Sequence, residues 1–200
     1  MKYILMNIPM SKATHEGRKT NTRRPIKGVD GYEFESMAVN LRSGDKHAVF
    51  SNDGHIKQIK PKYQVGETIW VREPVKITNI INRPRHENSE VVFKYKADDK
   101  KEKIPLFKFE RLKDSDGFLP KWLRNHKGIP NGCIKEMARI FLKVTNVIVE
   151  RLQDISDEDI KKEGLDDDPR IVNCEIEGSI TSPKVKREEY IILWNKTASK

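Results

Sequence analysis

The residues best suited to chemistry in this chain lie in one short segment, Gly17-Arg18-Lys19-Thr20-Asn21-Thr22-Arg23-Arg24-Pro25. Four cationic side chains and two hydroxyls fall within these nine residues. Guanidinium and ammonium groups recognise phosphates, while hydroxyls and an amide can fix the orientation of a bound molecule. The segment predicts a binding site for a polyanion or a polar small molecule, and a solvated basic loop is the simpler alternative.

Glu163 is a second residue whose side chain could take part in a reaction. Ser156 can cap a short helix, with Asp159 three residues further on, and Gly164 can end it. Glu163 then falls in the last turn, where the negative end of the helix dipole favours a protonated carboxyl unless a neighbouring lysine offsets it. A glutamic acid in that state can serve as a general acid, and an ordinary exposed glutamate is the alternative.

Charge is distributed unevenly along the chain, whose formal net charge is +9. Residues 1–27 hold seven Lys or Arg and one acid, whereas residues 153–170 hold eight acids and three bases. This asymmetry predicts one basic face and one acidic face. A basic face is the usual electrostatic footprint of a protein that binds nucleic acid.

Other site classes find little support in the residues. Cys133 and Cys174 are the only cysteines, and neither has a partner at metal-ligand spacing, while the five histidines are scattered. We therefore expect no metal and no cofactor. The apolar stretches are too short for a membrane span or a signal-peptide core, which favours a cytoplasmic protein without a membrane partner.

The elements that must position these residues are those of one α+β domain spanning residues 1–200. The sequence predicts short strands within 36–60, broken at 43–45 and at 52–54, where Asp53-Gly54 is a hairpin signal. It predicts further strands at 3–8, within 65–74 after a turn at Gly66, at 91–97 and at 140–152. The predicted helices are 10–17 and 156–164, each closed by its final glycine, and 187–200. The run at 140–152 is the longest and should be a central strand. Segment 76–118, with a Pro/Arg/His-rich patch at 82–86, is predicted to elaborate the main fold.

Two aromatic residues and one arginine complete the candidates. Trp70 and Arg72 share one face of the strand that follows Gly66, so Trp70 could offer a stacking surface for a base. A core tryptophan is the alternative that we favour slightly. Tyr190, Leu193 and Trp194 recur as on the buried stripe of an amphipathic helix, and Trp194 is interpreted as a core residue.

In their order, four segments resemble an ASCH domain, a member of the PUA-like superfamily, and in particular the prophage-encoded ASCH proteins. The segments are 17–25, Gly66-Glu67-Thr68-Ile69-Trp70-Val71-Arg72-Glu73, Val144 through Ser156 with the helix to Gly164, and Leu193-Trp194-Asn195. The resemblance spans nearly the whole chain. It implies a small mixed β-barrel of the PUA type with flanking helices, a cytoplasmic phage or prophage protein, and a role linked to RNA.

The family's small bacterial members include amidohydrolases that remove the acetyl group from 4-acetylcytidine. Their catalytic lysine and threonine lie three residues apart after a Gly-Arg pair, as do Lys19 and Thr22, and their glutamate occupies a place similar to that of Glu163. The resemblance thus implies that Lys19 deprotonates Thr22, that Thr22 attacks the amide, and that Glu163 protonates the leaving nitrogen. Arg24 would stabilise the oxyanion or hold the substrate. Neighbouring cations should lower the pKa of Lys19.

The leading interpretation is a nucleic-acid-related ASCH protein that binds RNA or a modified nucleoside in a basic cleft. The residues expected there are Arg18, Lys19, Thr22, Arg23, Arg24, Trp70, Arg72 and Glu163. One alternative is an amidohydrolase that uses Lys19, Thr22 and Glu163. A further alternative is a phage protein that binds a host factor through the acidic stretch 154–168 or through segment 76–118. The chain is roughly twice the size of the small enzymes, which leaves catalysis open.

Overall fold

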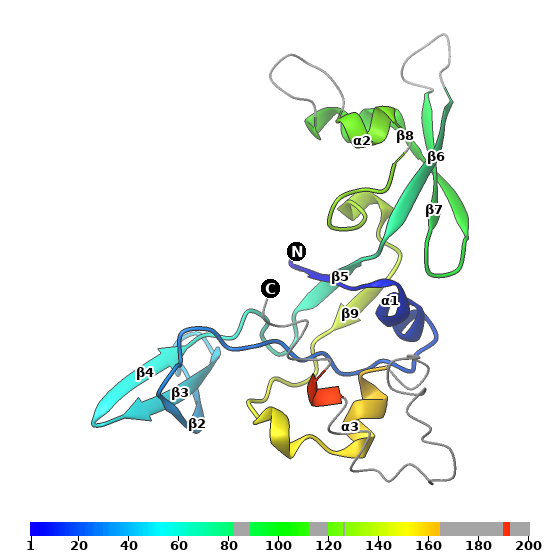
Figure 1. The fold of residues 1–200 in the computed structure, drawn as a ribbon. Coiled ribbons are helices and arrows are strands. Elements are labelled where there is room, and N and C mark those ends of the chain that lie inside the picture. The colour runs from blue at the N-terminus through cyan, green and yellow to red at the C-terminus, as the bar shows by residue number, and fades with distance from the viewer. Residues whose placement is uncertain (82–88, 113–119, 126, 165–189, 193–200) are drawn as a thin grey trace, which may run out of the picture. The chain divides into compact units, whose positions relative to one another are not determined.

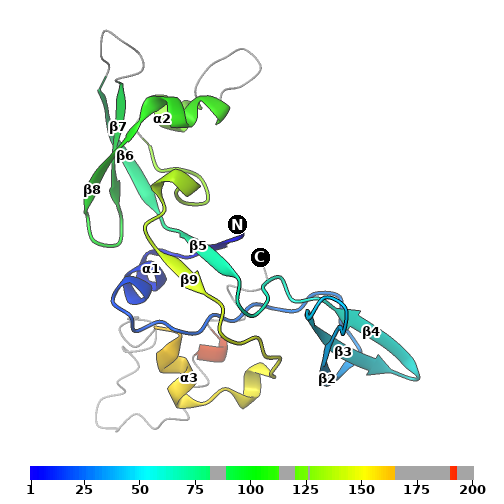
Figure 2. The same ribbon diagram turned by 180° about the vertical axis from the view of Figure 1, so that it is seen from behind.

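Three small sheets and a few short helices make up a mixed α+β fold (Figures 1 and 2). The structure is a computed structural model that describes residues 1–81, 89–112, 120–125, 127–164 and 190–192. The sheets have the strand orders β1-β5-β9, β2-β3-β4 and β6-β7-β8. The predicted α+β class is confirmed, and no sheet within these residues closes into a barrel.

The strands are β1 (Tyr3–Leu5), β2 (Glu33–Val39), β3 (Lys46–Asn52), β4 (His55–Ile59), β5 (Thr68–Arg72), β6 (Val75–Ile81), β7 (Glu90–Tyr95), β8 (Lys101–Pro105) and β9 (Phe141–Lys143). The α-helices are α1 (Ile8–His15), α2 (Lys121–Arg124) and α3 (Asp157–Lys162). The 3₁₀ turns are η2 (Leu106–Leu112), η3 (Lys135–Met137) and η4 (Leu152–Asp154).

The chain divides into two compact units. Unit 1 comprises Met1–Glu16 and Ile69–Leu142, and unit 2 comprises Gly17–Thr68 and Lys143–Lys200. Neither unit is a continuous stretch of sequence, because the chain passes from one to the other three times. The assignment of the whole chain to one domain stays a prediction.

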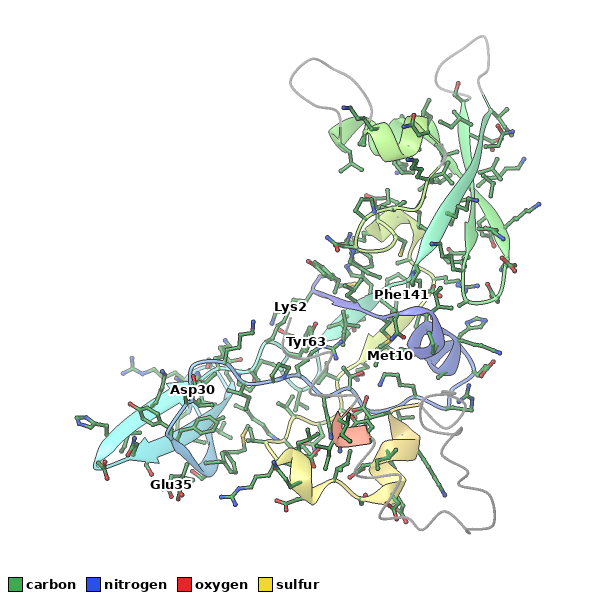
Figure 3. The ribbon with its side chains drawn as sticks, viewed as in Figure 1. Lys2, Met10, Asp30, Glu35, Tyr63 and Phe141 are labelled. Carbon is green, nitrogen blue, oxygen red and sulfur yellow. The ribbon has the colours of Figure 1, made fainter. Side chains whose placement is uncertain are left out.

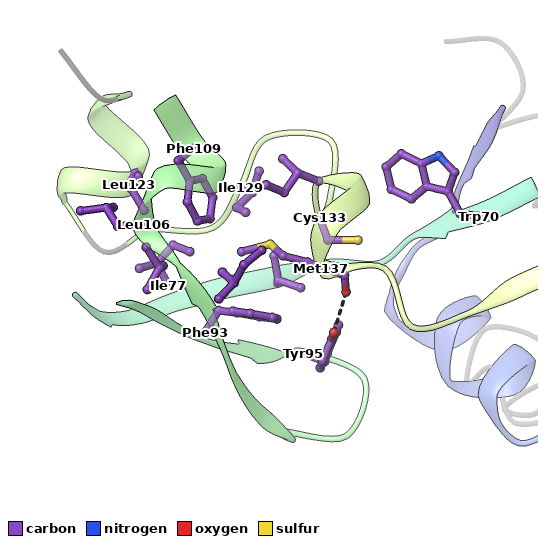
Figure 4. Packing of buried hydrophobic residues seen from close by; sticks show 14 residues of the cluster. Trp70, Ile77, Phe93, Tyr95, Leu106, Phe109, Leu123, Ile129, Cys133 and Met137 are labelled. Atoms are coloured by element: carbon purple, nitrogen blue, oxygen red, sulfur yellow. Dashed lines mark hydrogen bonds between the residues drawn. The ribbon is translucent and has the colours of Figure 1, made fainter. Parts of the chain in front are cut away.

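A hydrophobic cluster in unit 1 packs on one face of β6–β7–β8 (Figure 4). Ile77, Phe93 and Phe109 are almost completely buried in it. Burial of side chains of this size stabilises the folded state by about 1.5–3 kcal/mol each. The Tyr95 hydroxyl donates a hydrogen bond of 2.6 Å to the Met137 carbonyl at the edge of the cluster (Figure 4). The segment predicted to be an elaboration therefore supplies much of the core of its unit.

Helix α1 has clear start and stop signals. The Asn7 side chain accepts a hydrogen bond from the Met10 amide (2.9 Å), and Pro9 stands in the first turn. Gly17 has φ +76° directly after the cap residue Glu16. The predicted helix is thus confirmed, and it begins two residues earlier than expected. Strand β1, predicted as a buried strand, is buried at Ile4 and exposed at its two neighbours.

Sheet β2-β3-β4 in unit 2 is an antiparallel meander, with side chains on both of its faces (Figure 3). The turn between β3 and β4 is Asp53-Gly54, where both residues have positive φ angles of 45° and 80°. Such a pair is typical of a two-residue hairpin turn that follows the twist of its strands. The short strands and breaks predicted within residues 36–60 are confirmed.

The prediction of a long central strand at 140–152 is wrong. Only Phe141–Lys143 is a strand, and it lies at the edge of its sheet, in which β5 is central. The Val144 amide and carbonyl bond to the turn at Gly66 and Glu67 instead of continuing the ladder. The Asn146 side chain then accepts from the Val147 amide (2.9 Å), a local bond that competes with strand pairing. β-propensity alone did not anticipate these partners.

Several expectations lie outside the described residues. They are the patch at 82–86, most of the predicted C-terminal helix with Trp194, and Cys174. Within that helix, residues 190–192 are described and helical.

Candidate functional site

The basic segment runs past the C-terminal end of helix α3 in unit 2. The backbone amides of Thr20 and Asn21 both donate to the Lys162 carbonyl, at 2.8 and 3.0 Å. The last carbonyls of a helix have no partner within the helix, so the segment supplies the donors that this end needs. The polar residues of the segment are therefore held against the end of α3.

Helix α3 forms as predicted. The Ser156 hydroxyl accepts from the Asp159 amide (3.1 Å), and Ile155 and Ile160 are both buried. Gly164 has φ +71° after the helix. Glu163 is the C-terminal cap residue, one position beyond the helix, and only 3% of it is exposed.

Lys19 and Glu163 form a buried ion pair between residues 144 positions apart. The Lys19 Nζ also donates to the Asn21 carbonyl (2.6 Å) and to the Glu163 carbonyl (3.0 Å). An ammonium group has three N–H donors, so all three are satisfied in this arrangement. Sequence reasoning placed both residues in one site, and the structure brings them into direct contact.

Arg23 is bound by three carboxylates. Its Nε donates to Glu150, its NH1 donates to Glu163 Oε1 at 3.0 Å, and its NH2 lies 3.4 Å from Asp159 Oδ2. Burial alone lowers the pKa of Arg23, but the hydrogen bond and charge of Glu150 and the charge of Glu163 raise it above its usual value. The guanidinium is therefore a fixed structural cation.

Tyr190, from the C-terminal part of the chain, interacts with two residues of this site, Glu163 and Arg23. It is 2% exposed. Burial and the negative charge of Glu163 raise its pKa. We refer to Lys19, Arg23, Glu150, Asp159, Glu163 and Tyr190 as the polar cluster. Its two cations face three carboxylates, so the cluster carries no excess of positive charge.

The pKa of Lys19 is lowered, as expected, but mainly for another reason. Burial of the ammonium has the largest effect, Glu163 opposes it by its charge and hydrogen bond, and Arg24 and Arg23 lower the pKa further. Neighbouring cations thus contribute in the predicted direction. The main cause is desolvation, which disfavours the charged form.

The other predicted residues of the segment are more open. Thr22 is half-buried, and its hydroxyl makes no hydrogen bond to another described residue. Arg24 is exposed, and its NH1 donates to the Arg23 carbonyl at 2.7 Å. Arg18 is half-buried. Thr22 is thus not joined to Lys19 by a hydrogen bond in this arrangement.

Trp70 and Arg72 belong to unit 1, whereas the polar cluster belongs to unit 2. Trp70 is 6% exposed and forms part of the hydrophobic cluster, which supports the core interpretation over a stacking surface. Arg72 does not pair with Glu73. Its Nε donates to the Cys133 carbonyl (3.3 Å), and its guanidinium lies 4.8 Å from the centre of the Tyr3 ring.

Sequence reasoning missed Glu150 and the Arg23-binding role of Asp159. Asp159 was recognised only through its position in the cap of α3, and no motif distinguishes Glu150 from other exposed acids. Tyr190 was expected on a buried stripe and is buried. No sequence pattern predicted its interaction with Arg23.

Within the described part of the chain, no group of three or more His, Cys, Asp or Glu side chains could hold a metal ion. No described helix has the length and apolar character needed to cross a bilayer. No protein-family model, no curated protein and no solved structure matches this chain.

Proposed function

We propose that this protein is an ASCH-type, PUA-like protein that binds a modified nucleoside, free or within RNA, at the polar cluster. The observation that carries the proposal is the buried Lys19–Glu163 ion pair. The resemblance to the ASCH family put these two residues into one site from motifs at opposite ends of the chain. A direct contact between them is what that assignment requires, and chance pairing of two buried charges is uncommon because burial is costly.

A neutral, polar ligand fits this site better than a phosphate does. Arg23, which was expected to bind phosphate, is already held by Glu150, Asp159 and Glu163. A phosphate would meet these carboxylates as well as the cations. A nucleobase offers amide and carbonyl groups that hydrogen-bond without adding charge, so a nucleoside is the ligand that we favour.

Amidohydrolysis is the second candidate, favoured by the hydrogen bond between Lys19 and Glu163. Transfer of one proton from the ammonium to the carboxylate would give a neutral amine and a neutral acid. These are the forms that a general base and a general acid need. The lowered pKa of Lys19 reduces the free-energy cost of this transfer, while Arg23 opposes it by stabilising the carboxylate.

The reaction then balances with Thr22 as nucleophile. The Lys19 amine takes the Thr22 hydroxyl proton as the oxygen attacks the acyl carbonyl, and an ester to Thr22 forms. The C–N bond breaks, and the Glu163 proton passes to the leaving exocyclic nitrogen. Water hydrolyses the ester, which releases the carboxylic acid and restores the threonine.

Hydrolysis and binding of 4-acetylcytidine test both candidates. We expect the wild-type protein to bind 4-acetylcytidine, measured by calorimetry, and to release cytidine. Thr22→Ala should lower turnover by at least about 10²-fold. The melting temperature of the Thr22→Ala protein should equal that of wild type, because Thr22 is half-buried and its hydroxyl bonds to no described residue.

Glu163→Gln serves as the second variant, with its folding checked by circular dichroism, and should also lose turnover. Turnover that survives in Thr22→Ala would overturn the nucleophile assignment while leaving nucleoside binding in place. A folded wild-type protein that binds neither 4-acetylcytidine nor cytidine would overturn the proposed function. Binding of inorganic phosphate in preference to the nucleoside would contradict the choice of a neutral ligand.

A further inference from the structure

A row of lysines crosses the sheet β6-β7-β8 on the face turned away from the hydrophobic cluster. The register places Lys76 of β6 opposite Lys94 of β7, and Lys94 opposite Lys101 of β8. Neighbouring strands lie about 4.8 Å apart, so three side chains of like charge stand next to one another. Like charges directly opposite in a sheet are destabilising. The row of lysines therefore lowers the stability of the folded sheet through charge repulsion.

Two more lysines extend the row along the same face. Side chains alternate between the two faces of a strand, so Lys103 lies on the same side as Lys101. Lys96 directly follows β7, and its Nζ lies 3.6 Å from where a Cβ at Gly128, the bridge partner of Lys76, would stand. Their neighbours in sequence, among them Phe93 and Ile104, point into the core. Nitrogen-tipped side chains extend outward from these strands (Figure 3). We refer to Lys76, Lys94, Lys96, Lys101 and Lys103 as the lysine face.

The positive charge of the lysine face is only partly compensated. Lys103 lies 3.6 Å from Glu90, and Lys94 pairs with Asp99 in the β7–β8 turn. The other three members, Lys76, Lys96 and Lys101, form no ion pair with any described residue, and all three are exposed. Five cations against two acids leave three uncompensated positive charges on one small sheet face.

The chemistry of this face suits the backbone of a nucleic acid duplex. A duplex carries one negative charge for about every 1.7 Å of its axis, a density that can engage several closely spaced ammonium groups at once. Asn79 and Val92 share the face with the lysines, and the described strand residues of this face include no aromatic ring on which an unpaired base could stack. Nor do these described residues include the Trp, Phe or Leu side chains that anchor a protein in a lipid surface.

We propose that the lysine face binds the phosphates of a nucleic acid duplex without reading its sequence. The face belongs to unit 1, and the polar cluster belongs to unit 2, so this inference goes beyond the proposed function. It assigns the protein a second class of ligand. It also gives a reason for the row of opposed lysines, which packing alone does not explain.

Salt-dependent binding of the full-length protein to a short RNA duplex and a short DNA duplex tests the proposal. The test variant is Lys76→Gln/Lys101→Gln, and the matched control is Lys135→Gln/Lys143→Gln, which removes the same charge at two exposed sites off this face. Each lost phosphate contact lowers the slope of log K against log salt by about 1. We expect the magnitude of this negative slope to be smaller by about 2 in the test variant than in wild type. The control should keep the wild-type slope.

Further arms separate the alternatives. Because the test variant removes the two cations that stand opposite Lys94, it should melt at the same temperature as wild type or higher. Weaker binding is then not the result of unfolding. An equal loss of binding in test and control variants would mean a net-charge effect and overturn the proposal. Tighter binding to single strands, or to vesicles of anionic lipid, would also overturn it.

The two proposals fail separately. Turnover or binding of 4-acetylcytidine should be unchanged in Lys76→Gln/Lys101→Gln. Nucleoside binding without duplex binding would overturn only the lysine face, and duplex binding without nucleoside binding would overturn only the proposed function.

Discussion

Two buried carboxylates, Glu73 and Glu163, each bind at least one cation from a distant part of the chain. Glu73 is 0% exposed and accepts from Arg139 Nε (2.9 Å) and NH2 (3.1 Å), while Glu163 binds Lys19 and Arg23. Desolvation of such charges is costly, so the pairs persist only because each charge is matched by several hydrogen bonds. At the residue scale, these pairs position the basic segment 17–25 in unit 2 and the end of β5 in unit 1.

Arg139 also binds Asp98, and this contact gives a pH-dependent prediction. The hydrogen bond from Arg139 lowers the pKa of Asp98 below its usual value of 3.8. A lowered folded-state pKa contributes stability above the unfolded-state pKa, and that stability is lost as the pH falls through the folded-state value. We expect Asp98→Asn to lower the free energy of unfolding by about 0.5–1 kcal/mol at neutral pH. The difference should vanish in acid well below the folded-state pKa.

Urea unfolding of both proteins at neutral and acidic pH measures this difference. Asp99→Asn is the control, because its side chain is 75% exposed and should matter less. A difference between Asp98→Asn and wild type that stays constant with pH would show that the carboxylate charge is not involved.

At the scale of elements, the loop before η3 fits closely against the end of β5. Gly132 has φ +82°, and a Cβ at this position would lie 2.9 Å from the Arg72 carbonyl oxygen and 3.0 Å from that of Glu73. The neighbouring Cys133 amide donates to the Glu73 carbonyl at 2.7 Å. Glycine is thus required here for two reasons, its backbone conformation and the space that it leaves.

Gly132→Ala should therefore destabilise the protein more than Gly17→Ala. Both residues have positive φ, but a Cβ at Gly17 would have no atom within 4 Å. The left-handed conformation costs each alanine about 1–2 kcal/mol. The clash should add about 1–3 kcal/mol at Gly132. Urea unfolding of both variants gives the comparison, and equal losses would contradict the close approach.

At the scale of the whole molecule, the N-terminal segment belongs to a unit whose remaining residues begin only at Ile69. Strand β1 pairs in parallel with β5, with Ile4 opposite Val71. The Met6 amide donates to the Arg72 carbonyl at 3.3 Å. The stability of unit 1 should therefore depend on residues that precede the whole of its main segment.

Ile4→Ala and Leu5→Ala test this dependence as a matched pair. Ile4 is 3% exposed and Leu5 is 46% exposed, although they are adjacent in one strand. We expect Ile4→Ala to lower the free energy of unfolding by about 2–5 kcal/mol. Leu5→Ala should cost clearly less. Thermal and urea unfolding measure both, and similar losses would show that β1 does not pack as described.

The sequence by itself determined the features that depend on neighbouring residues. The glycine end of α1, the Asp53-Gly54 turn and the Ser156 cap of α3 are all short-range signals, because each rests on backbone conformation or on a bond within a few residues. The core position of Trp70 was also favoured, since large aromatic side chains are usually buried. These predictions are confirmed.

The tertiary structure alone decided which groups meet across the chain. In the fold, Arg23 bonds to Glu150, Arg72 bonds to the Cys133 carbonyl, and the backbone of Val144 bonds to the turn at Gly66. It also set the register that aligns the lysine face. No local pattern encodes such partners, because a charge or a strand edge can pair with many others, and the packing of distant segments selects one. The resemblance anticipated Lys19 with Glu163, and only the fold could bring them together.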